Sequence, residues 1–158
     1  MSTTHTFDHL DVLTRAHEES EPALSRAARS PSKKAIWGSR IMTGIVVLFL
    51  AFDATFKMLQ SPEAVEGTTQ LGYPSSVILG LGLLQVALLV IYLVPRTAVL
   101  GALLWTGYLG GAVATHVRVG NPLFSHTLFP IYIGALVWGA LWLRDEKLRA
   151  LLPVRTGR

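Results

Sequence analysis

The chain has 158 residues, of which 51% are hydrophobic and only 15% are charged, and it contains no cysteine. A soluble domain carries about 25% charged residues, and here thirteen of the 24 charged residues lie before position 41 or after position 150, which excludes a water-soluble core between them. The lack of cysteine excludes disulfides, thiolate metal sites, iron–sulfur clusters, covalently attached haem and a thiol redox relay. The net charge of +4 does not indicate nucleic acid, because the basic residues flank apolar segments, where they set membrane orientation.

Residues 1–35 are polar and of mixed charge. Such a segment cannot bury enough apolar surface to fold alone, so we expect a disordered cytoplasmic tail. It contains no apolar stretch of the kind that a signal peptide needs. We expect residues 36–150 to form one transmembrane domain and residues 151–158 to form a basic C-terminal tail.

Four apolar segments follow, at about residues 41–59, 76–94, 98–116 and 122–143. A helix of about 19 residues spans roughly 28 Å at 1.5 Å per residue, which matches a hydrocarbon core of about 30 Å. A buried strand would need only four to eight residues, so the length of the segments favours helices. The pattern predicts an all-α membrane protein, a bundle of four transmembrane helices in up-down-up-down order.

The connections are rich in proline and glycine. Gln60–Ser75 contains two acids and no base and is predicted to be a loop, and Pro95-Arg96 is predicted to form a tight turn. Asn121-Pro122 has the form of an N-cap followed by proline at the first helical position. Pro130 falls inside the fourth segment and predicts a kink there.

The positions of Lys and Arg predict the orientation. Counted from Arg26 onward, eleven of them lie on the side of the two termini, and Arg118 alone lies in a loop on the other side. The eleven are Arg26, Arg29, Lys33, Lys34, Arg40, Arg96, Arg144, Lys147, Arg149, Arg155 and Arg158. This positive-inside bias predicts a bacterial inner-membrane protein with both termini in the cytoplasm.

Small residues recur every four positions on the third segment, at Gly107, Gly111 and Thr115. Because lipid gives no hydrophobic drive between helices, close packing over small residues has to hold a bundle together. We expect this stripe to pack against a neighbouring helix. A homodimer through Gly107 and Gly111 is the alternative.

Ionisable residues gather toward one end of the predicted bundle. Asp53 and Lys57 lie four residues apart on one helical face, in the order that favours an intrahelical ion pair. The topology brings His116, Arg118 and His126 to the same outer third, and it places Gln85 near the middle of the second segment. A central charge costs about 2.5–3.5 kcal/mol on insertion scales, so this cluster needs an explanation.

Three interpretations of the cluster stay open. The groups satisfy one another and fix helix register, or they line an outward-facing pocket for a polar head on an apolar tail, such as a quinone or a lipid. Five aromatic residues are candidates for lining that pocket, with interfacial anchoring and packing as the alternative roles: Tyr73, Trp105, Tyr108, Tyr132 and Trp138. In the third interpretation His116, His126 and Asp53 bind a metal or haem, although no pair has a characteristic ligand spacing, and we predict no metal site.

Four short motifs occur in order between Arg40 and Arg144. They are Phe52-Asp-Ala-Thr-Phe-Lys57, Leu71-Gly-Tyr-Pro74, Gly82-Leu-Leu-Gln85 and Gly111-Ala-Val-Ala-Thr-His116-Val-Arg118. In these motifs the chain resembles the DoxX-like family of small four-helix bacterial membrane proteins. The resemblance implies a four-helix bundle and places Lys57, His116 and Arg118 at the family's characteristic polar positions. Many relatives carry Glu where this chain has Gln85, so here that position lacks a charge and is a poor proton relay.

Related DoxX proteins are linked to membrane redox complexes and to quinone-dependent thiosulfate oxidation. The resemblance therefore implies an accessory subunit of a membrane redox system, or a small bundle that binds a quinone or lipid. One alternative is a quinone-linked oxidoreductase subunit that uses His116 and Asp53 for proton transfer. The other is a structural or chaperone-like scaffold in which Asp53 and Lys57 serve stability alone.

Overall fold

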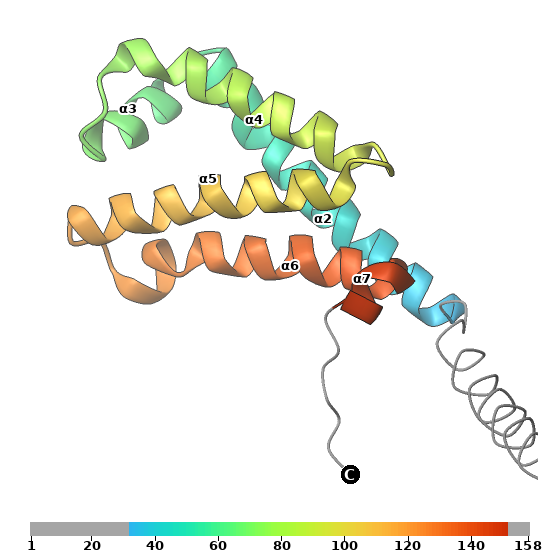
Figure 1. Cartoon of the computed structure of the whole chain (residues 1–158). Coiled ribbons are helices and arrows are strands. Elements are labelled where there is room, and N and C mark those ends of the chain that lie inside the picture. The colour runs from blue at the N-terminus through green and yellow to red at the C-terminus, as the bar shows by residue number, and fades with distance from the viewer. Residues whose placement is uncertain (1–31, 152–158) are drawn as a thin grey trace, which may run out of the picture.

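The computed structural model describes residues 32–151, and these form helices and connections with no strand among them (Figure 1). The long helices are α2 (Lys33–Met58), α4 (Ile78–Leu93), α5 (Ala98–Arg118) and α6 (Phe129–Arg144). With the short turns before α4 and α6, all four are long and apolar enough to cross a membrane. The predicted all-α fold with four transmembrane helices is confirmed. The tails predicted at the two ends lie almost wholly outside the described residues.

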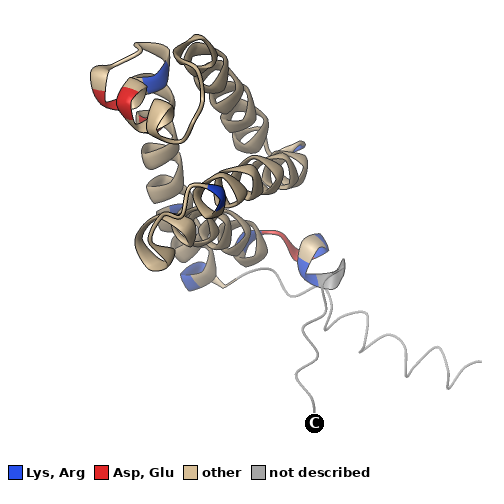
Figure 2. Cartoon of the chain, turned by 90° about the vertical axis from the view of Figure 1, so that its left-hand side faces the viewer, with Lys and Arg blue, Asp and Glu red and all other residues tan. Residues whose placement is uncertain are grey.

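The four long helices form a closed ring. Helix α2 packs against α4 and α6, and α5 packs against the same two helices from the other side (Figure 2). One end of the bundle carries the short helix α3 (Pro62–Gln70) and the connection from α5 to α6, and we call it the α3 end. The other end carries the first turn of α2, the α4–α5 turn and the short helix α7 (Glu146–Leu151), and we call it the terminal end.

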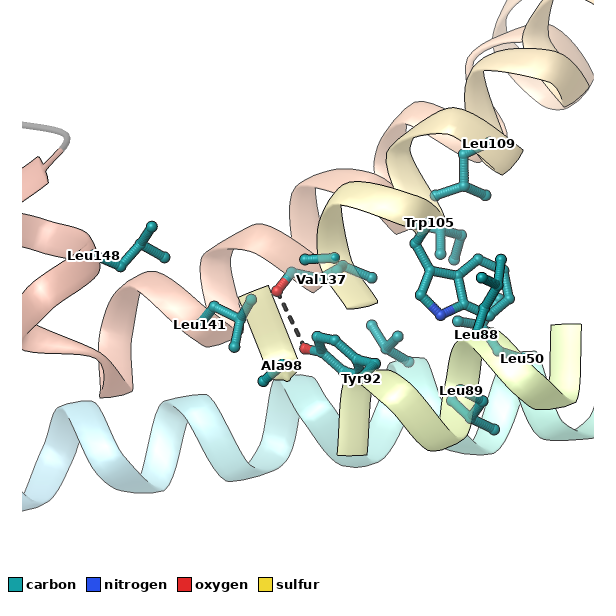
Figure 3. Packing of buried hydrophobic residues seen from close by; sticks show 13 residues of the cluster. Leu50, Leu88, Leu89, Tyr92, Ala98, Trp105, Leu109, Val137, Leu141 and Leu148 are labelled. Carbon is teal, nitrogen blue, oxygen red and sulfur yellow. Dashed lines mark hydrogen bonds between the residues drawn. The ribbon is translucent and has the colours of Figure 1, made fainter. Parts of the chain in front are cut away.

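The core fills the terminal half of the ring. Trp105, Tyr92 and Val137 are fully buried there, within a cluster of apolar side chains (Figure 3). The Tyr92 hydroxyl donates to the Val137 carbonyl oxygen at 3.2 Å, and the Ser39 hydroxyl donates to the Ala140 carbonyl oxygen at 2.7 Å. In lipid, where apolar burial gives little net drive, such packing and interhelical hydrogen bonds supply the cohesion.

Two glycines allow the closest approaches of one helix to the backbone of another. A Cβ atom at Gly101 would lie 2.5 Å from the Tyr92 backbone, and one at Gly82 would lie 2.9 Å from the Met58 backbone nitrogen. By contrast, Cβ atoms at Gly107 and Gly111 would meet nothing within 4 Å. The prediction that Gly107 and Gly111 pack against a neighbouring helix of the bundle is therefore wrong, because they face open space. The homodimer through these glycines stays a prediction.

The connection between the first two spans is a helix for most of its length, so the predicted loop is wrong there. Helix α3 begins because the Ser61 hydroxyl accepts a hydrogen bond from the Ala64 amide at 3.3 Å, Pro62 occupies the first turn and Glu63 follows it. Gln60 at φ 49° and Gly72 at φ 82° reverse the chain on either side of this helix.

The fourth span is interrupted near its start. A single π-helical turn covers Leu123–Thr127, and the regular helix begins only at Phe129. Pro130 therefore lies in the first turn, where its missing N–H costs no helical hydrogen bond, and the predicted kink inside a continuous helix is wrong. Asn121 is not an N-cap as predicted, since its side chain contacts His116 instead.

Candidate functional site

The α3 half of the ring contains a partly open cavity of about 400 Å³. All four long helices contribute to its wall, together with α3 and the segment that follows it. We call it the central cavity. Its lining residues are Phe49, Leu50, Asp53, Lys57, Thr68, Leu71, Tyr73, Leu81, Gln85, Gly107, Tyr108, Leu109, Gly111, Ala112, Thr115, His116, Phe129, Pro130 and Ile133.

The cavity exists because small residues of α5 face large residues of the other helices. Gly107, Gly111 and Ala112 provide little volume on one wall. Between α2 and α6, the rings of Phe49 and Phe129 meet edge to face, with centroids 5.2 Å apart. Most of the lining is thus apolar, which suits a hydrocarbon or aromatic group.

Asp53, Lys57 and Gln85 form a polar network on the α2 and α4 side of the cavity. Asp53 accepts hydrogen bonds from Lys57 on the next turn of α2 and from Gln85 Nε2 on α4, the latter at 2.6 Å. Gln85 is only 2% exposed, and its Oε1 has no hydrogen-bond donor within the described part of the chain. The carboxylate and the ammonium balance each other, so the network carries no net charge.

Two tyrosines and a threonine extend the polar lining toward the α3 end. Thr115 donates its hydroxyl proton to the Gly111 carbonyl oxygen at 2.9 Å. The Tyr73 hydroxyl, 3.0 Å from Thr115 Oγ1, must then be the donor in that pair, because a hydroxyl has one proton to give. Tyr108 also lines the cavity, and its hydroxyl has no hydrogen-bond partner among residues 32–151.

The other three aromatic candidates do not line this cavity. Trp105 is fully buried in the core, and Tyr132 is 47% exposed on α6. The Trp138 indole N–H donates to Thr106 Oγ1 at 2.9 Å, beside a second cavity of about 340 Å³ between α5 and α6. That second cavity is almost entirely apolar, and Gly110 of α5 lines it.

The two histidines meet at the rim of the central cavity. Their rings are T-shaped with centroids 5.9 Å apart. His116 lines the cavity and its Nδ1 lies 2.8 Å from Asn121 Nδ2, whereas His126 lies outside the lining with its Nδ1 2.8 Å from the Ser125 hydroxyl. Within residues 32–151 no three His, Asp or Glu residues come together in a group fit for a metal ion.

Arg118 lies at the same end of the bundle as His116 and His126 but does not line the central cavity. Its guanidinium donates to the Leu71 carbonyl oxygen at 2.5 Å and lies against Gly72, so it fastens the end of α3 to the end of α5. Of the six residues of the predicted polar cluster, four line the central cavity: Asp53, Lys57, Gln85 and His116. Arg118 and His126 do not line it, but each contacts a residue that does: Arg118 binds the Leu71 carbonyl oxygen, and the His126 ring lies against His116.

Sequence reasoning missed the contribution of α3. Thr68, buried on that helix, and Leu71, just after it, line the cavity, and both fall within the predicted loop. The signal that could have found them is Ser61-Pro62-Glu63, a capping residue followed by proline and an acid.

The comparison with protein families agrees with this architecture. No curated protein and no solved structure matches the chain. The model of the DoxX-like family matches residues 41–140, which include the four long helices from Ile41 to Ala140 and the whole lining of the central cavity. This membrane protein, with four helices around a cavity of mixed polarity, belongs to the DoxX-like family.

Proposed function

We propose that the central cavity is a binding site for a membrane-soluble molecule with a polar head and an apolar tail, such as a quinone or a lipid. One observation carries the proposal: a single cavity joins the Asp53–Lys57–Gln85 network to a mostly apolar wall. The head of the ligand would contact the network, and the rest would contact residues such as Phe49 and Ile133. A volume of about 400 Å³ is within the usual range of small-molecule sites.

We place the protein in the bacterial inner membrane with both termini in the cytoplasm. The terminal end of the described bundle carries most of its Lys and Arg residues, and the α3 end, which faces the viewer in Figure 2, carries Glu63 and Glu66. The positive-inside rule favours the basic end as the cytoplasmic one. The central cavity would then lie in the outer half of the membrane.

We assign the protein an accessory role in a membrane redox system, in which it holds or delivers the ligand without converting it. The described residues of the cavity include no nucleophile paired with a base, which favours binding over catalysis. Electron flow through the host's membrane redox chain should fall when the gene is deleted and recover with the intact gene. Unchanged electron flow after deletion would end this assignment.

A second candidate function is a quinone-linked oxidoreductase subunit. It is favoured by the presence of His116 and Asp53 in the wall of one cavity, where both could exchange protons with a quinone head. This function requires turnover of a quinol or quinone by the purified protein with its redox partner. It also requires that His116→Ala abolish turnover while the protein remains folded.

The test of binding is native mass spectrometry of the protein extracted gently from its own membranes, with an absorption spectrum of the same sample. We expect a retained molecule in the wild type and its loss in Lys57→Ala and His116→Ala. A folded protein that carries no small molecule under any mild extraction would refute the binding site. Asp53 and Lys57 would then serve stability alone, as in a structural scaffold.

A further inference from the structure

Gln85 lines the central cavity and carries a buried hydrogen-bond acceptor that no described residue satisfies. A carboxylate has no proton to donate, so the Gln85 amide must turn its NH₂ group toward Asp53 and its Oε1 away from it. The side chain is only 2% exposed and lines the cavity, and this Oε1 has no donor among residues 32–151. A buried carbonyl oxygen without a donor is costly, so a ligand that supplies an O–H or N–H group gains affinity there.

The charge of the network limits the charge of the ligand. The Asp53 carboxylate already has the Lys57 ammonium as its partner, and the described lining holds no further ionised Asp, Glu, Lys or Arg side chain. An anionic head would meet the repulsion of Asp53 as well as the attraction of Lys57, and a cationic head would meet the reverse, so the pair favours neither sign of charge. In a low-dielectric site either one would be buried without a counter-charge of its own.

Tyr108 provides a second hydrogen-bonding group in the cavity, a hydroxyl that can donate to the ligand. It lies on α5 across the cavity from α2, and its hydroxyl makes no hydrogen bond with the described residues. A hydroxyl group on the ligand satisfies both walls, because it donates one proton and accepts on its oxygen. An ether or an ester oxygen can accept a hydrogen bond from Tyr108, but it has no proton to donate to Gln85 Oε1.

We infer that the ligand has an uncharged head with at least one hydrogen-bond donor, most simply a hydroxyl, and that this donor binds Gln85 Oε1. The inference rests on the proposed function, because it specifies the head of the molecule that the central cavity holds. It selects neutral alcohols, phenols and amides with an apolar tail, and it excludes phospholipids and fatty acids in their anionic forms.

The test compares three probes that share one tail: para-nonylphenol, its methyl ether and its phosphate monoester. Each is titrated at equal membrane concentration into the full-length protein in lipid nanodiscs, and the bound fraction is read by native mass spectrometry. One added hydrogen bond corresponds to about a tenfold difference in affinity, so the phenol should bind about tenfold more tightly than the ether. The phosphate should bind more weakly than the phenol.

Two variants and a control separate the hydrogen bond from the size of the methyl group. Gln85→Met keeps the side-chain volume but removes Oε1, so the preference for phenol over ether should fall to about one. Tyr108→Phe should weaken phenol and ether together and leave their ratio unchanged. Thr106→Val, beside the second cavity, is the control for a polar change on α5 outside the site.

The outcomes distinguish this inference from the proposed function. Equal binding of phenol and ether by the wild type overturns the inference while the binding site stands, and this comparison needs no variant. A preference that persists in Gln85→Met, or a phosphate that binds as tightly as the phenol, overturns it as well. Failure of all three probes in a protein that also retains no native molecule refutes the proposed function itself.

Discussion

Gln85 Nε2 donates a hydrogen bond of 2.6 Å to Asp53 Oδ2, and this bond joins α4 to α2 in the α3 half of the bundle. Asp53 also accepts from Lys57, so one carboxylate oxygen holds both a neighbouring turn of its own helix and a second helix. Helix α4 packs closely on α2 one turn earlier, at Gly82. The packing contact and the polar contact together fix the rotation of α4, and with it the side chains that face the central cavity.

Removing one charge of the Asp53–Lys57 ion pair should destabilise the fold. Asp53→Asn leaves a hydrogen-bond acceptor for Gln85 but leaves the Lys57 ammonium without its counter-charge. The penalty should be below the 2.5–3.5 kcal/mol of a central charge, because Lys57 is near the end of α2, and we expect a loss of roughly 1–2 kcal/mol. Reversible unfolding in bicelles measures this loss.

The double variant Asp53→Asn/Lys57→Met provides the matched control. It removes both charges, so it should regain at least half of the stability that the single variant loses. Equal stability of Asp53→Asn and the wild type would show that the pair contributes nothing to the fold.

Two glycines of α5 should respond in opposite ways to alanine. Gly101→Ala places a Cβ atom 2.5 Å from the Tyr92 backbone and should destabilise the bundle by about 1–3 kcal/mol, since the helices must move apart. Gly107→Ala meets nothing within 4 Å and should be neutral or stabilise by up to about 1 kcal/mol through helix propensity. Thermal unfolding in one lipid composition compares the two, and equal effects would contradict the assigned contacts.

Arg118 should control the opening of α3. Arg118→Gln removes the hydrogen bond to the Leu71 carbonyl oxygen, and a hydrogen bond from a charged donor corresponds to at least about a tenfold change in a local opening equilibrium. Amide hydrogen exchange across α3 should accelerate by that factor, with no change in the core around Trp105. Arg96→Gln, in the turn at the terminal end, is the control. Unchanged exchange in α3 would show that Arg118 does not fasten it.

The proposed orientation can be tested directly because the chain has no cysteine to remove. A membrane-impermeant maleimide added to intact spheroplasts should label Glu66→Cys on α3 and should leave Lys147→Cys unlabelled until the membrane is permeabilised. The reverse pattern would place the termini outside the cytoplasm and the central cavity in the inner half of the membrane.

The sequence predicted the four spans because each has a long apolar stretch and clear breakers at its ends, as at Pro95. It also predicted the Asp53–Lys57 pair, because residues four apart on a helix share a face. The convergence of Asp53, Gln85 and His116 on one cavity depends on helix rotation, which hydropathy does not encode when lipid and core are both apolar.

The same limit explains why the packing predicted for Gly107 and Gly111 is wrong. A stripe such as Gly107–Gly111 has the same form in sequence whether it allows a helix to approach or leaves a space beside a cavity. The two glycines that let helix backbones approach closely, Gly82 and Gly101, are isolated and carry no periodic signal. Helix α3 was missed because Gly67 and the flanking prolines suggested a loop, although the capping residues at Ser61 and Glu63 favoured a helix.

The most direct test of the central claim uses two adjacent glycines of α5, both with open space at Cβ. Gly111 lines the central cavity and Gly110 lines the second one. Native mass spectrometry of Gly111→Leu and Gly110→Leu, extracted side by side from host membranes, compares what each retains. We predict that Gly111→Leu loses the bound molecule and Gly110→Leu keeps it at the wild-type level, with both proteins folded. Retention by both variants, or loss from both, would contradict a binding site in the central cavity.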